Sequence, residues 1–343
     1  MKMLRSSTLK FGTILAAVAL LAGCAAAPAP APAPSKEPAP AEVAPIKTSL
    51  TFSYSAAVQQ LEKVPISLAL GNLAKDGVTT KETFHQSGDD AVQAVARGES
   101  DFGTANAATV FAAIKKGVPI KAIMTAYYPA YLLVAPVSAK NAGDLDGMRV
   151  GIHSNISSTT LYTNLALAKY PKAKPEILIV PGSANRVQAM IAGQLDASVV
   201  QFADWLTIQR EAPGKYHVIY DVAVEAAGII DSLIFTNTQT LASDPGYVKQ
   251  FLGALQSEYA SVYTDEKKLA KDIAAIVPKT TPEAAAELAK TSIADKIWPA
   301  DGGFTKEKIE ATLKALSDAE LLTADTVPTF GTCCTSEFLK QGK

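Results

Sequence analysis

Short apolar runs alternate with amphipathic segments between residues 50 and 236. The apolar or β-branched runs predict strands at residues 50–54, 79–84, 102–104, 120–126, 131–135, 149–152, 177–180, 197–200, 217–221 and 232–236. Helical spacing of apolar residues predicts helices at residues 65–74, 89–96, 107–116, 159–169 and 185–192. The alternation predicts an α/β protein with mostly parallel sheets and right-handed crossovers.

One phrase occurs twice in this pattern, in residues 93–101 and 188–196. In each copy a helical run stops at a glycine, Gly98 or Gly193. An aspartate, Asp101 or Asp196, follows three residues later and leads into a short apolar run. Glycine ends a helix at little steric cost because it readily adopts the left-handed conformation. The repeat therefore predicts the same helix–turn–strand unit in two similar lobes, and small molecules commonly bind between lobes.

The last hundred residues are predicted to be helical and to pack on the first lobe. Asp244 precedes Pro245, a pair typical of an N-cap followed by the first helical position. Thr281 and Thr305 are expected to begin two further helices.

The first 24 residues have the features of a bacterial lipoprotein signal peptide. Lys2, Arg5 and Lys10 precede or flank an apolar run at residues 11–22, and small residues lead to Cys24. The run is too short to span a bilayer, so a transmembrane anchor is the weaker interpretation. We expect removal of residues 1–23, lipid attachment to Cys24 and an extracytoplasmic location on a cell membrane.

Residues 24–46 are predicted to be a tether. The segment is almost entirely alanine and proline, which cannot build a core. Such a chain extends at about 3 Å per residue, which allows a reach of roughly 60 Å at most. The folded body could therefore move above the membrane.

Composition excludes several classes of protein. A hydrophobic content of 48% and a charged content of 19% are ordinary for a soluble globular body. Loss of the signal peptide removes three positive charges and no negative ones, so the formal net charge moves from −1 to −4. A nucleic-acid partner is therefore not expected. Besides Cys24 the only cysteines are Cys333 and Cys334, which lack metal-site spacing; a free pair is favoured over a strained disulfide between neighbours.

Four phrases occur in a characteristic order, at residues 98–103, 116–121, 144–151 and 189–197. Together they resemble the substrate-binding proteins of ABC importers in the nitrate, sulfonate, taurine and thiamine-precursor group, over residues 50–330. The resemblance implies a two-lobed periplasmic-binding-protein-like (type II) fold. Each lobe would be a mostly parallel sheet flanked by helices, and a hinge would close the lobes on a ligand before docking on a membrane permease.

The lobe boundaries follow from the strand pattern. The first lobe is predicted at residues 47–135 and 237–343, and the second at residues 136–236. The strand at 131–135 is interpreted as leaving the first lobe, and the strand at 232–236 as returning to it.

Ligands bind beyond the carboxyl ends of parallel strands, which selects a set of loops as the candidate site. The candidate ligand-binding residues in those loops are Ser53, Tyr54, Ser55, Gln86, Ser87, Asn106, Tyr127, Tyr128, Ser154, Asn155, Ser157, Ser158, Thr159, Phe202 and Trp205. Helix N-termini there could hold a carboxylate, sulfonate or phosphate without a charged side chain. Two alternatives stay open, because each hydroxyl could instead be a helix N-cap and each aromatic side chain could pack in the core.

Arginine is scarce in these loops, and Arg186 is the only one near them. A strongly anionic ligand usually pairs with an arginine fork. We therefore favour a weakly anionic or neutral organic ligand, such as a sulfonate, carboxylate or pyrimidine, over nitrate.

The function expected from these features is capture of a small solute and its delivery to an ABC importer by a monomeric lipoprotein. No cofactor, metal or catalytic residue is expected. Two alternatives remain: a ligand-binding partner of a membrane sensor, or an enzyme similar to the thiamine-pyrimidine synthase relatives of the family. The enzyme alternative draws on His85 and His153, but Cys333 and Cys334 do not match a longer cysteine cluster.

Overall fold

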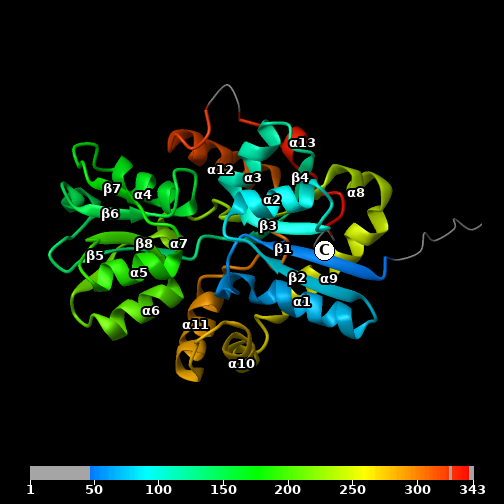
Figure 1. Cartoon of the computed structure of the whole chain (residues 1–343), viewed down its shortest axis with the longest axis horizontal. Helices are drawn as coiled ribbons and strands as arrows, with labels where there is room; N and C mark the ends of the chain where they lie inside the picture. The colour runs from blue at the N-terminus through cyan, green and yellow to red at the C-terminus, as the bar shows by residue number, and fades with distance from the viewer. Residues whose placement is uncertain (1–46, 324–326, 340–343) are drawn as a thin grey trace, which may run out of the picture. The chain divides into compact units, whose positions relative to one another are not determined.

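The computed structural model of the protein describes residues 47–323 and 327–339, and its first sheet has the strand order β2-β1-β3-β10-β4 (Figure 1). The strands are β1 (Ser49–Tyr54), β2 (Thr79–Phe84), β3 (Phe102–Asn106), β4 (Ile120–Tyr127) and β10 (Ser232–Asn237). β1 pairs in parallel with β2 and β3, whereas β10 runs antiparallel to β3 and β4. Four strands therefore run one way and β10 runs the other.

The second sheet has the same plan, in the order β7-β6-β8-β5-β9. Its strands are β5 (Tyr131–Pro136), β6 (Arg149–Ile152), β7 (Glu176–Ile179), β8 (Ala197–Gln201) and β9 (Tyr216–Asp221). β6 is parallel to β7 and β8, and β5 is antiparallel to β8 and β9. Both sheets are thus mixed, with one reversed strand among four that share a direction.

The reversed strands are the two that follow the chain crossings between the sheets. β5, expected to be the last strand of the first lobe, pairs only within the second sheet, and β10 pairs only within the first. Three residues separate β4 from β5. A parallel neighbour in the same sheet needs a crossover of a dozen residues or more, so the chain runs on into the second sheet instead.

Helices cover both faces of the first sheet (Figure 1). On one side, α1 (Val64–Lys75) and α9 (Pro245–Ser261) form a hydrophobic cluster with Phe52 and Phe102 of the sheet, and Phe251 stacks on Phe102 with ring centroids 4.2 Å apart. On the other side, α2 (Gly88–Ala96) and α3 (Ala107–Lys115) form a second cluster with Phe235. Burial of aromatic rings on both faces makes this sheet the centre of the packing.

The second sheet is flanked in the same way, with α4 on one side and α5 and α6 on the other (Figure 1). These elements are α4 (Ser158–Ala168), α5 (Ser183–Ile191) and α6 (Phe202–Glu211). Three short helical elements lie between the strands: η1 (Leu61–Lys63) after β1, η2 (Ala142–Leu145) after β5, and α7 (Val222–Glu225) after β9. The predicted helices and strands of residues 50–236 are all present, and α6 is an additional helix that the pattern did not predict.

The C-terminal part is helical, as predicted. Besides α9 it contains α8 (Thr238–Ser243), α10 (Glu266–Ile276), α11 (Pro282–Ala294), α12 (Lys306–Asp318) and α13 (Phe330–Cys333). Thr281 and Thr305 cap α11 and α12, and Asp244 occupies the N-cap position of α9 without a side-chain hydrogen bond. α9 packs on α1, but α11 also contacts α6 and α12 also contacts α4. The C-terminal helices therefore join elements of both sheets.

The repeated phrase forms the predicted turn twice. Gly98 follows α2 with φ +73°, and Gly193 follows α5 with φ +70°. The aspartates then join neighbouring strands: Asp101 accepts the backbone N–H of Thr51 (2.8 Å), and Asp196 accepts that of Arg149 (2.8 Å). Each aspartate backbone N–H also donates to the carbonyl of the same partner residue. The two copies thus anchor β3 to β1 and β8 to β6 in the same way.

Cys333 and Cys334 are joined by a disulfide bond and are buried at the end of α13. The favoured expectation of a free pair therefore differs from the structure. Cys334 forms an isolated bridge with Ala122 of β4, which fixes the backbone at the point where the ring closes. Within the described ranges, no helix combines the length and the apolar content that crossing a bilayer requires.

Candidate functional site

The chain passes between the two sheets from β4 to β5 and from β9 to β10, and buried polar side chains gather at these crossings. Asp231 directly precedes β10, and its carboxylate oxygens accept hydrogen bonds from the hydroxyls of Tyr162 (2.8 Å) and Ser232 (2.9 Å). Burial raises the pKa of Asp231, and hydrogen bonds from Tyr162, Ser158 and Ser232 oppose this rise. Since Tyr162 and Ser158 belong to α4, Asp231 connects the second sheet's flanking helix with a strand of the first sheet.

Two further buried charges, Glu62 and Lys63, lie in η1, which follows β1. Glu62 Oε2 accepts a hydrogen bond from Gln201 Nε2 (3.1 Å), and Gln201 ends β8 of the second sheet. Lys63 Nζ donates to Gln60 Oε1 and lies 5.6 Å from the centroid of the Tyr127 ring. Burial raises the pKa of Glu62 to about 7 against the opposing charge of Lys63, and burial lowers the pKa of Lys63.

The second sheet contributes Arg186 and Asp204 to the same region. Arg186 lies in α5, is 4% exposed, and donates from Nη1 to the carbonyl of Val180 (3.2 Å). Burial lowers the pKa of Arg186, and the charge of Asp204 opposes that shift. Asp204 accepts the Ser183 hydroxyl and caps the start of α6. Burial raises the pKa of this carboxyl as well.

Tyr131 lies within electrostatic reach of all three parts of this region. Its pKa is raised mainly by burial, further by the charges of Asp231 and Glu62, and is lowered by Arg186. Such mutual effects require that the groups be near one another in a low-dielectric setting. We call Glu62, Lys63, Arg186, Asp204 and Asp231 the junction cluster.

The hydroxyl-rich loop before α4 lies beside this cluster and is tied together by its own hydrogen bonds. Ser157 Oγ donates to the carbonyl of Ser154 (2.8 Å) and pairs with the hydroxyls of Thr159 (2.8 Å) and Thr160 (3.1 Å). Thr159 Oγ1 in turn accepts the backbone N–H of His153 (2.8 Å). The loop is therefore held in one conformation by its own side chains.

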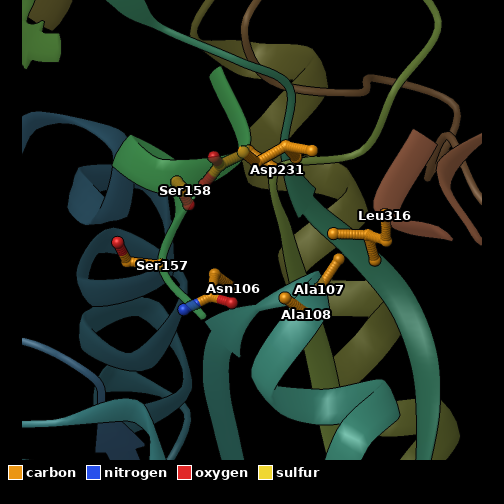
Figure 2. Close-up of a pocket in the computed structure, with 8 residues that line it drawn as sticks. Asn106, Ala107, Ala108, Ser157, Ser158, Asp231 and Leu316 are labelled. Atoms are coloured by element: carbon orange, nitrogen blue, oxygen red, sulfur yellow. The ribbon is translucent and has the colours of Figure 1, made fainter. Parts of the chain in front are cut away.

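A narrow crevice separates this loop from the start of α3. Figure 2 shows Ser158 beside Asp231, with Ser157 on the loop side and with Asn106 and Ala107 on the other side, where β3 meets α3. The crevice has no room for a water molecule as it stands. A solute could reach the cluster through it only if the two walls moved apart.

Comparison with protein families gives a match over residues 69–268 to the family described as NMT1/THI5-like. The match covers more than half of the sequence. The chain belongs to the NMT1/THI5-like family. None of the curated proteins compared with this sequence matches it.

Solved structures share the fold of this NMT1/THI5-like protein at low sequence identity. One is the zinc-bound ligand-binding component of an ABC-type import system from Staphylococcus aureus, with 11% identity, a TM-score of 0.70, and coverage of 85% of this chain and 98% of that one. Another is the alkanesulfonate-binding protein SsuA from Xanthomonas axonopodis pv. citri bound to MOPS, with 18% identity, a TM-score of 0.64, and coverage of 82% and 96%. The nitrate-binding protein NrtA from Synechocystis has 12% identity, a TM-score of 0.58, and coverage of 82% and 83%. These matches show the periplasmic-binding-protein fold.

The structure brings together only part of the predicted site residues of this NMT1/THI5-like protein. Asn106, Ser157 and Ser158 line the crevice with Asp231, and Tyr127 lies under Lys63. Thr159 and Ser154 belong to the same loop network, while Asn155 is exposed at its tip. Phe202 is buried in the hydrophobic cluster at the start of α6, and Trp205 packs against that cluster while half-buried.

Several of the other predicted residues have the alternative roles that the sequence left open. Tyr54 is fully buried and stacks on Phe84, with ring centroids 4.9 Å apart. Ser53 is buried and bonds to the hydroxyl of Ser100 (2.8 Å). Tyr128 contacts Lys308 of α12, whose Nζ lies 4.4 Å from its ring centroid.

Two predicted hydroxyl or amide side chains act as helix caps. Ser87 accepts the backbone N–H of Asp90 (3.2 Å), and Asn106 accepts that of Thr109 (2.9 Å). Ser55 is half-buried after β1, and Gln86 is exposed after β2. Cys24 lies outside the described residues.

Four members of the junction cluster were not among the predicted residues, and Arg186 was named only as a nearby arginine. Glu62 and Lys63 stand before a proline-initiated helix, where charged residues usually face water. A signal was nevertheless available, because the rule that selects loops after strands extends to the start of the next helix. If every residue between the end of a strand and the first turn of the next helix is taken as a candidate, the rule includes Glu62 and Lys63 after β1, and Asp204 after β8.

Proposed function

We propose that this protein is a lipid-anchored extracytoplasmic solute-binding protein that captures a small organic molecule or anion between two lobes and delivers it to an ABC importer. The observation that carries this proposal is the junction cluster, in which Glu62 from one side and Arg186 from the other are buried and the half-buried Asp204 lies beside Arg186. Buried charges are costly unless they are paired, so proteins keep them mainly where they have a role. Family membership and the shared fold agree with a binding function.

The proposed lobes centre on the two sheets. The expected boundaries at residues 135 and 236 move to residues 130 and 231, because β5 pairs in the second sheet and β10 in the first. The first lobe then comprises residues 47–130 with 231–343, and the second comprises residues 131–230. Support for a solute site between them comes from hydrogen bonds across the junction: Gln201 at the end of β8 bonds to Glu62 and, through Oε1, to Gln60 Nε2 (3.3 Å). A bound solute that contacts both sides would favour the closed arrangement of the lobes through its differential contacts.

The proposed membrane anchor is a lipid on Cys24, followed by the tether at residues 24–46. Both lie outside the described residues. The substitution Cys24→Ala should prevent lipidation and move the protein from the membrane fraction to the soluble fraction of fractionated cells. Retention of the variant in the membrane fraction would contradict the lipid anchor.

A thermal-shift screen tests solute binding directly. A ligand that binds only the folded state at about 100 times its Kd adds about 2.7 kcal/mol of stability. For a body of this size that corresponds to a rise in Tm of roughly 5 °C. We expect such a rise from at least one member of a panel of sulfonates, nitrate, aromatic acids, pyrimidines and flavins. A panel without any effect would count against the proposed function.

Two single substitutions of aromatic residues test which part of the surface binds the ligand found in the screen. Trp205→Ala is expected to weaken binding of the best hit, because Trp205 follows β8 and lies near Asp204 in α6. Tyr170→Ala is the matched control, since Tyr170 is exposed after α4. Unchanged affinity in the Trp205 variant would remove this residue from the site.

The enzyme alternative finds little support in the arrangement of its candidate residues. His85 Nε2 lies 3.1 Å from the Ser53 hydroxyl, and His153 Nδ1 accepts the backbone N–H of Gly182 (3.1 Å). Cys333 and Cys334 are bonded to each other beside β4. Among residues 47–323 and 327–339, no group of three or more His, Cys, Asp or Glu side chains could hold a metal ion. Turnover of a pyrimidine or sulfonate by the purified protein would revive this alternative.

A further inference from the structure

Two charged side chains of the junction cluster have a buried polar atom that lacks a hydrogen-bond partner among the described residues. These atoms are Glu62 Oε1 and Arg186 Nε. The other buried atoms in this condition within residues 47–323 and 327–339 are hydroxyls, of Thr104, Thr163 and Ser292. An unpaired buried atom of a charged group costs more than an unpaired hydroxyl, so Glu62 and Arg186 are the sites where a missing partner matters most.

Glu62 and Arg186 approach the junction from opposite sides but are connected through two residues. Glu62 Oε2 accepts from Gln201 Nε2, and the backbone N–H of Gln201 donates to Asp204 Oδ2 (3.3 Å). Asp204 is in turn the strongest charge acting on Arg186. Hydrogen bonds thus link η1, the end of β8 and α6, and Arg186 of α5 lies near enough to Asp204 for the two charges to interact.

The chemistry of the two atoms is complementary. A carboxylate oxygen accepts a hydrogen bond, and a guanidinium N–H donates one. A simple inorganic anion could pair with Arg186 but would be repelled by the negative charge of Glu62. A simple cation could pair with Glu62 but would face the positive charge of Arg186. A solute with groups of both kinds would satisfy both atoms at once.

We propose that the solute of this site carries both an N–H donor, which bonds to Glu62 Oε1, and an acidic oxygen, which accepts from Arg186 Nε. The inference rests on the proposed function and narrows its substrate class to amino-substituted acids. It also revises the preference drawn from the scarcity of arginine, since the one arginine near the candidate loops is buried within the cluster. Nitrate and unsubstituted acids are then poor ligands.

Matched probe pairs test the solute class by thermal shift and calorimetry. The pairs are taurine with ethanesulfonate, β-alanine with propionate, and 4-aminobenzoate with benzoate, each with the corresponding simple amine. We expect at least one amino acid of the set to bind, and to bind about tenfold or more tightly than its partner without the amine. Equal binding of the acid-only partner would overturn the inference, because a protonated Glu62 could then serve as a donor to any anion.

Two conservative variants test the residues. Glu62→Gln removes the charge that faces the amine, and Arg186→Lys keeps the charge opposite Asp204 but removes the Nε–H donor. Each should lower the affinity for the bound amino acid by about tenfold or more. Tm without ligand should change little or rise for Glu62→Gln, because the atom that it alters has no partner in the fold. Unchanged affinity in both variants would contradict the assignment of these residues.

Control variants separate a binding role from a structural one. Glu258→Gln alters a buried carboxylate that already accepts Asn72 Nδ2 (2.9 Å), and Arg149→Lys alters a guanidinium that already pairs with Asp196. Both should leave affinity unchanged, and Arg149→Lys should lower Tm.

If no probe pair binds but the wider panel yields a ligand of other chemistry, the inference fails and the proposed function stands. If nothing in either set binds, the proposed function itself is contradicted.

Discussion

At the scale of single residues, burial changes the meaning of charged positions that look ordinary in the sequence. Glu62 and Lys63 precede a helix in a way that usually leaves such side chains in water, yet both are almost fully buried. Trp298 lies more than two hundred residues further along the chain, and its Nε1 donates a hydrogen bond to the carbonyl of Glu62 (2.8 Å). A local pattern has no access to such a contact. The sequence could select the loop, but it could not show which of its residues would be enclosed.

The raised pKa of Glu62 has a measurable effect on stability. In the folded state the pKa is about 7, against an ordinary value of 4.5. Between these values the folded state binds more protons than the unfolded state, so stability falls as pH rises through this window. The difference amounts to roughly 3 kcal/mol at pH above 7. Glu62→Gln should remove this contribution.

Urea unfolding at pH 5 and pH 8 checks this expectation. Relative to the unsubstituted protein, the Glu62→Gln variant should be more stable at pH 8 than at pH 5 by roughly 2–3 kcal/mol. Comparison of the two proteins cancels the contributions of Asp204 and Asp231, which are present in both. Glu287→Gln, at an exposed position of α11, serves as the control and should follow the unsubstituted protein. An equal effect of Glu62→Gln at both pH values would show that Glu62 does not titrate in this window.

At the scale of elements, the repeated phrase is the feature that the sequence predicted most completely. Helix, glycine turn and strand occur at both copies because the glycines adopt positive φ and each aspartate anchors the adjacent strand. These are local features, which explains why they could be recognised. The pairing of β5 and β10 was less accessible, since an apolar run does not show in which sheet it will pair. α6 was missed because Phe202 and Trp205 were interpreted as part of a ligand-binding loop after β8.

The two aspartates of the repeat should make similar contributions to stability. Asp101→Ala and Asp196→Ala each leave a backbone N–H of the neighbouring strand without its side-chain acceptor and remove an ion pair with Lys47 or Arg149. Each variant should lose about 1–2 kcal/mol of unfolding free energy in urea titrations. Glu287→Ala should stay within about 0.5 kcal/mol. If either aspartate variant matched the control, the proposed equivalence of the two turns would be wrong.

At the scale of the whole molecule, two sheets of the same plan are joined by two crossings, and the buried Asp231 lies in one of them. The sequence predicted two lobes and placed the site between them. The loops after β1, β3 and β8 do contribute residues to the junction, whereas the position after β2 and the ring of Tyr54 do not. A crevice too narrow for a water molecule implies that entry of a solute requires the walls to separate. We therefore expect an open form in solution and a closed form with solute.

Small-angle X-ray scattering tests this central claim most directly. The purified protein is measured without ligand and with a saturating concentration of the best ligand from the thermal-shift screen, and the radius of gyration is compared. We expect the radius of gyration to decrease on binding, because a solute held by both lobes shifts the equilibrium toward the closed form. An unchanged radius of gyration at saturation would contradict closure of the two lobes on a solute.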